Sequence, residues 1–71
     1  MKRSELHLRV DDRVVLRCGM ERKVSEVTLL YDREYPVYVG GAWLTDKGTF
    51  LTTGVPHNSD IISVNGQVID E

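Results

Sequence analysis

The sequence predicts an all-β protein, a small barrel or rolled antiparallel sheet of five to seven short strands. Of its 71 residues, 18 are β-branched (ten Val, three Ile and five Thr), and such residues favour strands. Only one Ala is present, although Ala is the best helix former. Short apolar segments recur about every ten residues between Gly, Asn and Asp, as in small antiparallel barrels.

The length and the cysteine count limit the number of domains and the cellular compartment to be expected. A chain of 71 residues accommodates a single domain, residues 1–71, that buries roughly 60% of its unfolded surface. Cys18 is the only cysteine, whereas small secreted domains usually carry several in disulfides. The first residues lack the apolar run of a signal peptide, and no stretch approaches 18 apolar residues. We therefore expect a cytoplasmic protein without a membrane partner.

The first half of the chain predicts three strands. Residues 6–10 alternate apolar and polar side chains, which indicates a strand with one buried face. A turn at Asp11-Asp12 separates it from a short strand at 13–17, which ends at Cys18-Gly19.

The longest predicted strand spans residues 22–30, and here alternation fails between Val24 and Val27. A helix would explain this spacing, but it needs apolar residues at positions 28 and 31, which hold Thr28 and Tyr31. A β-bulge near Ser25-Glu26 explains the same slip and bends the strand, as a barrel requires. We therefore favour a strand.

The second half predicts further strands and two hairpins. After a loop at 31–34, residues 35–39 form a strand that begins near Pro36. Residues 42–45 and 49–52 are expected to pair through an Asp-Lys-Gly turn, and residues 53–60 to form a loop. The segments at 61–64 and 67–69 flank Asn-Gly, the dipeptide preferred in a type I′ turn.

The order of these segments resembles a known group of proteins. Residues 14–19 have the form V-x-L-R-x-G, followed by Val24, a Tyr-Pro-Val segment at 35–37 and Gly40. Residues 43–50 have the form W-x-T-x-x-G-x-F, and Asp-Ile-Ile follows at 60–62. This pattern is similar to that of small, mostly uncharacterised SH3-like barrels encoded by bacteriophages and prophages.

The resemblance covers residues 13–64. It implies a phage accessory protein that inhibits a host protein or sequesters a nucleotide signal. The flanking segments outside it suggest an added edge strand or a contact between copies of the chain.

The residues favour binding over catalysis. Cys18, His7 and His57 are the only thiol and imidazoles, and their spacing indicates neither a nucleophile–base pair nor a four-ligand zinc site. The adjacent acids at 11–12 and 70–71 lie in a turn and at the end of the sequence, where carboxylates are usually solvated. No phosphate-loop, nucleophile-elbow or zinc-protease motif is present. We therefore predict no catalytic residue, no metal site and no cofactor.

Five aromatic residues exceed what so small a core needs. We expect Phe50 and one of Trp43 and Tyr38 in the core. The remaining aromatics, with Tyr35 among them, would then be partly exposed and available for recognition. The alternative is that the tyrosines only cover the ends of the barrel. The predicted partner of the Tyr35, Tyr38 and Trp43 surface is a host protein, bound by these side chains or through a free strand edge.

The charge distribution leaves two other partners open. Residues 1–23 carry a net charge of +3 and residues 24–71 a net charge of −5, which gives the total of −2. Arg13, Arg17 and Arg22, with the neighbouring Lys23, could bind the phosphates of a nucleic acid or of a small anionic nucleotide. A predicted pI near 5.6 argues against nucleic acid, because phosphate neutralisation supplies most of that affinity.

Overall fold

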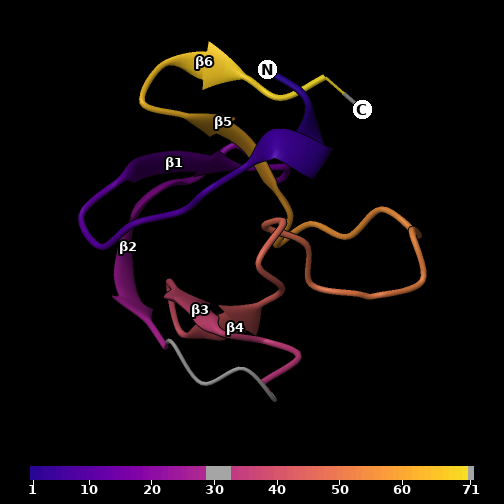
Figure 1. Cartoon of the computed structure of the whole chain (residues 1–71). Coiled ribbons are helices and arrows are strands. Elements are labelled where there is room, and N and C mark those ends of the chain that lie inside the picture. Colours follow the sequence, from indigo (N-terminus) through magenta and orange to yellow (C-terminus); the bar gives the residue numbers. More distant parts are fainter. Residues whose placement is uncertain (29–32, 71) are drawn as a thin grey trace.

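The computed structural model describes residues 1–28 and 33–70, and it contains one antiparallel sheet of six strands in the order β4-β3-β2-β1-β5-β6 (Figure 1). The strands are β1 (Arg13–Leu16), β2 (Glu21–Val27), β3 (Val37–Val39), β4 (Ala42–Leu44), β5 (Ile61–Val64) and β6 (Gln67–Val68). A single 3₁₀ turn, η1 (Arg3–Glu5), precedes them. The predicted all-β class and rolled antiparallel sheet are confirmed.

The long strand β2 bends the sheet into a roll. It pairs with β1 along its first half and with β3 along its second half, and the register shifts between Val24 and Glu26. This is the bulge expected near Ser25-Glu26. In Figure 1, β2 descends from the layer of β1, β5 and β6 to the layer of β3 and β4. The helical alternative for this segment is wrong, and positions 29–31 lie outside the described residues.

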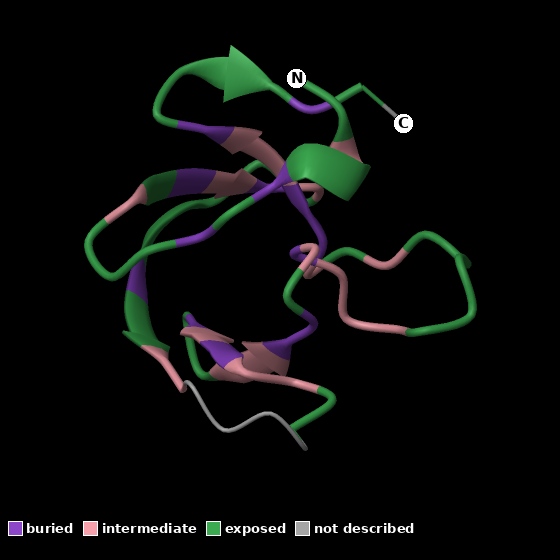
Figure 2. Ribbon diagram, viewed as in Figure 1, coloured by how far each residue is buried: buried purple, intermediate pink, exposed green. Residues whose placement is uncertain are grey.

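The core between these layers is aliphatic. The eleven buried hydrophobic residues of the described chain are all Leu, Val or Ile, from both layers and from residues 6–8 (Figure 2). Val24 and Ile61 are fully buried at 0% exposure. Phe50 packs against the core from its rim, and Trp43 and Tyr38 are only half-buried. The expectation of a second aromatic residue in the core is therefore wrong, because short aliphatic chains already fill this thin interior.

Two tight turns follow from local sequence. Gly40 and Gly41 have φ of +57° and +87°, so they form a two-residue turn that joins β3 to β4. Asn65 and Gly66 have φ of +49° and +86° and join β5 to β6 in the same way. The predicted Asn-Gly hairpin is thus present, with β6 ending at Val68.

Two predicted strands are absent. Residues 6–9 are extended and bury Leu6 and Leu8, as their alternation predicted, but they join no sheet. After β4 the chain reverses as expected, since Thr45 N–H donates to Thr49 C=O at 2.8 Å. Residues 49–52 nevertheless form no strand. The Phe50 N–H instead donates to the Asp60 carboxylate at 2.9 Å, which starts a long loop.

Both sheet edges are short. At β6 the chain returns beside the first residues, where Lys2 and Asp70 form a parallel bridge and Asp70 N–H donates to Met1 C=O. The edge strand β4 has three residues, and strands this short are poor templates for adding another strand. No helix within residues 1–28 and 33–70 is long and apolar enough to cross a membrane.

Candidate binding surfaces

Tyr38 and Trp43 form an aromatic pair on the outer face of β3 and β4. They are direct partners in the β3–β4 register, and their ring centroids lie 4.8 Å apart at 52°. Their neighbours Val37, Val39 and Leu44 are buried, so alternation turns both aromatic rings away from the core. Two of the predicted binding residues are therefore in contact.

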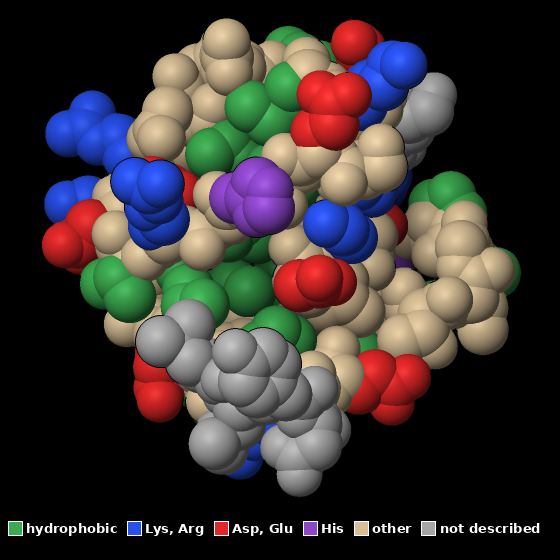
Figure 3. Space-filling view, viewed as in Figure 1, with side chains coloured by type: hydrophobic (Ala, Val, Ile, Leu, Met, Phe, Trp, Pro, Cys, Tyr) green, Lys and Arg blue, Asp and Glu red, His purple; other side chains and the backbone are tan. Residues whose placement is uncertain are grey.

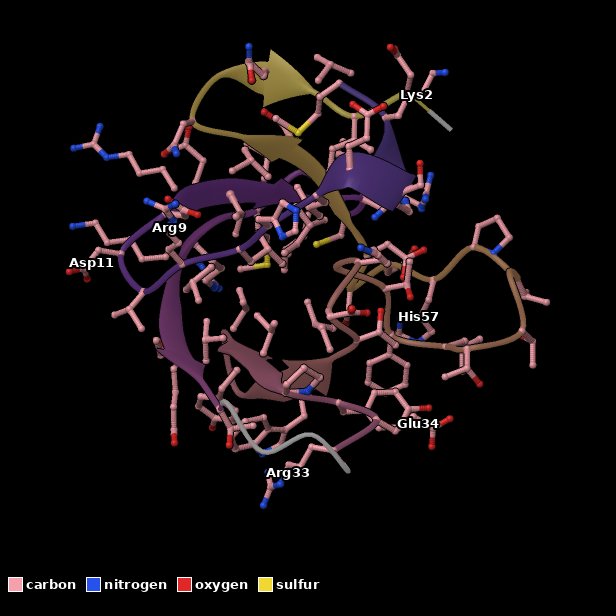
Figure 4. The ribbon with its side chains drawn as sticks, in the orientation of Figure 1. Lys2, Arg9, Asp11, Arg33, Glu34 and His57 are labelled. Atoms are coloured by element: carbon pink, nitrogen blue, oxygen red, sulfur yellow. The ribbon has the colours of Figure 1, made fainter. Side chains whose placement is uncertain are left out.

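Arg33 adds a cation to this tilted pair of rings, over Trp43. Its guanidinium carbon lies 5.0 Å from the centroid of the Trp43 ring, within the range of a cation–π interaction. In Figure 4, Arg33 lies on the side of β3 and β4 that faces away from β1. We call Arg33, Trp43 and Tyr38 the aromatic stack. Tyr35 is half-buried just before β3, and it makes no ring contact with the stack. Sequence reasoning missed Arg33, because a loop residue ten positions from Trp43 gives no local signal.

The structure brings together two of the three predicted arginines, Arg13 and Arg22, and places Arg17 elsewhere. Arg22 is the register partner of Val14, and its side chain is exposed. Its stem lies against Gly40, where an added Cβ would meet it at 3.2 Å, and its guanidinium donates to Glu21 C=O at 2.9 Å. Arg17 follows β1 and donates to the Asp60 carboxylate at 3.3 Å. Arg13 and Arg22 line one groove beside β1, β2 and β5, whereas Arg17 does not line it.

Asp60 is the one buried carboxylate among the described residues, at 2% exposure, and it closes the loop between β4 and β5. One oxygen accepts from Phe50 N–H and the other from His57 N–H, both at 2.9 Å, while Arg17 supplies the opposite charge. The Phe50 and His57 rings stack at 4.1 Å. We call this arrangement the Asp60 clamp. Figure 1 shows the clamped loop, in orange, projecting from the sheet.

Arg13 faces Lys23 across the β1–β2 pair. The two residues are direct register partners, and both are exposed. Neither takes part in an ion pair with an acidic residue of the described chain. Together with Glu21, Arg22, Ser63 and Asn65 they line a groove of about 660 Å³ beside β1, β2 and β5. Elsewhere the surface is mixed, and Figure 3 shows positive and negative side chains interspersed.

The remaining candidates for chemistry lie apart from these surfaces. Cys18 is exposed in the turn after β1. The Nδ1 of His57 accepts from Ser59 N–H at 3.0 Å, which fixes its ring in the clamp. Within residues 1–28 and 33–70, no group of three or more His, Cys, Asp or Glu residues is arranged to hold a metal ion.

No protein-family model matches the sequence, and no curated protein or solved structure is significantly similar to it.

Proposed function

We propose that this protein is a non-enzymatic binding module and that the aromatic stack is its contact surface for a partner protein. The observation that carries the proposal is the position of Tyr38 and Trp43. Both large rings lie outside an aliphatic core that is complete without them. Trp, Tyr and Arg are also the residues most enriched at the energetic centres of protein interfaces.

The geometry of the stack supports recognition by side chains. The rings are held by cross-strand contact and by the Gly40-Gly41 turn, so little conformational entropy would be lost on binding. Arg33 places a positive charge beside the indole ring. The three-residue edge of β4 offers few backbone groups for strand addition. We therefore propose contact through the rings rather than through this edge.

The resemblance to phage-encoded SH3-like barrels favours a host protein as the partner, and inhibition of that protein as the outcome. The chemistry of the stack is compatible with a partner surface that offers an apolar pocket beside a carboxylate. The pocket would accept an aromatic ring, and the carboxylate would pair with Arg33.

The test compares two double variants in affinity capture from bacterial lysate. Tyr38→Ser/Trp43→Ser removes the rings, and the control Val55→Ser/Val68→Ser removes two exposed apolar side chains elsewhere. We expect one partner to be captured by the wild type and the control, with at least about thirtyfold weaker affinity for the stack variant. Circular dichroism should show that both variants fold.

Two results would contradict the proposal. One is equal capture of the partner by the stack variant and the wild type. The other is the absence of any partner that survives competition with untagged protein.

A further inference from the structure

We propose that the outer face of β1 and β2 holds a site for a small phosphate-bearing ligand, centred on Arg13 and Lys23. This site lies on other strands than the aromatic stack and does not depend on the function proposed for it. The first observation is the pairing of Arg13 with Lys23 in the β1–β2 register. Like charges directly opposite one another destabilise a sheet. An anion bound between Arg13 and Lys23 would therefore relieve the repulsion between these two side chains.

Nothing within the described chain neutralises this pair. Glu21 lies two positions before Lys23 and lines the same groove, yet it forms no ion pair with either cation. Asp12 is occupied elsewhere, since it accepts from Arg9 N–H at 2.9 Å and from the Asn65 side chain at 3.1 Å. The two cations are therefore available to an external anion.

The groove adds neutral donors to the cations. Ser63 is the β5 partner of Val15 and lines the groove beside it. Its hydroxyl can donate to an anion, as Ser commonly does. Asn65 is fixed at the end of the groove, because its side chain accepts from Arg13 N–H at 3.0 Å. Arg suits a phosphate because its guanidinium can donate two parallel hydrogen bonds.

Size and surrounding charge favour a small ligand over a nucleic acid. A volume of about 660 Å³ falls within the range of small-molecule sites. Asp11 precedes Asp12 at the same end of β1 and is exposed (Figure 4). Arg22 adds a third cation to the groove, and Glu21 lines it as well. Because the chain as a whole carries a net charge of −2, an extended polyanion would meet repulsion beyond the first few phosphates.

The test uses pyrophosphate as the probe in thermal unfolding and titration calorimetry. We expect the unfolding midpoint to rise with pyrophosphate concentration and to rise less with sodium chloride of equal ionic strength. Arg13→Gln and Lys23→Gln should each weaken binding by at least about tenfold. The control Lys47→Gln removes a cation that lies 4.0 Å from Asp46, and it should bind as the wild type does.

Three outcomes would overturn the proposal. The first is equal stabilisation by pyrophosphate and by sodium chloride, which would reduce the effect to screening. The second is unchanged binding in both glutamine variants, which would place the ligand elsewhere. The third is a single-stranded oligonucleotide that binds more tightly than pyrophosphate at the same salt concentration, which would replace the small ligand by a nucleic acid. All variants are expected to fold, because both cations are exposed.

Discussion

The Asp60 clamp and the Arg13–Lys23 pair use charge in opposite ways. In the clamp, a buried carboxylate accepts two backbone hydrogen bonds and faces the guanidinium of Arg17. In the pair, two exposed cations face one another and neither has an acidic partner among the described residues. In the clamp, charged groups stabilise the fold through contacts within the chain. In the pair, the charged groups stay at the surface without such contacts.

The difference follows from the cost of burial. A buried carboxylate without partners would be strongly destabilising, so Asp60 is tolerated only where donors converge on it. Exposed cations stay solvated, and their mutual repulsion costs only a fraction of a kcal/mol. Two facing cations can therefore persist on a surface and remain available to a ligand, whereas an unpaired charge in the core would destabilise the fold. Substitutions at the two regions should change stability in opposite directions.

The largest expected effect belongs to Asp60→Ala. This change leaves the N–H groups of Phe50 and His57 without their acceptor and removes the carboxylate that faces Arg17. We therefore expect a loss of about 3 kcal/mol in the free energy of unfolding. Urea denaturation monitored by circular dichroism measures it. The exposed Asp46→Ala should change stability by less than about 0.5 kcal/mol. A similar small change in Asp60→Ala would show that the clamp does not stabilise the fold.

A smaller loss is expected for Arg17→Met, which keeps the aliphatic stem and removes the charge opposite Asp60. Because two backbone donors remain on the carboxylate, we expect a loss of about 1.5 kcal/mol. The double variant Arg17→Met/Asp60→Ala should lose less than the sum of the two single changes, because the residues interact directly. Strict additivity in the same denaturation experiment would contradict a coupled pair.

The smallest effect, and of opposite sign, is expected for Arg13→Gln. Removing one of two facing cations should raise the free energy of unfolding by about 0.3 kcal/mol at low ionic strength. The gain should vanish in high salt, which screens exposed charges. Denaturation curves at two salt concentrations measure this, with Lys47→Gln as the control. Destabilisation by Arg13→Gln at low salt would show that the pair has a partner within the chain.

Local chemistry made much of the fold predictable. The Asn-Gly turn, the buried Leu6 and Leu8, and the bulge after Val24 depend on residues only a few positions apart. The exposure of a Tyr–Trp surface was also foreseen in part, since the sequence has more aromatics than a small core needs. The missing strand at 49–52 was not foreseeable in this way, because the carboxylate that accepts from Phe50 lies ten positions away.

The sequence by itself determined that this chain forms short antiparallel strands, where it turns tightly, and which alternate residues are buried. Only the tertiary structure decided that Arg17 belongs to a clamp with Asp60, 43 positions away, while Arg13 faces Lys23. Turns and alternation depend on backbone sterics and on the pleat of a single strand. The partner of a charged residue depends on which distant segments the rolled sheet brings together. The residues next to it in the sequence do not indicate which segments these are.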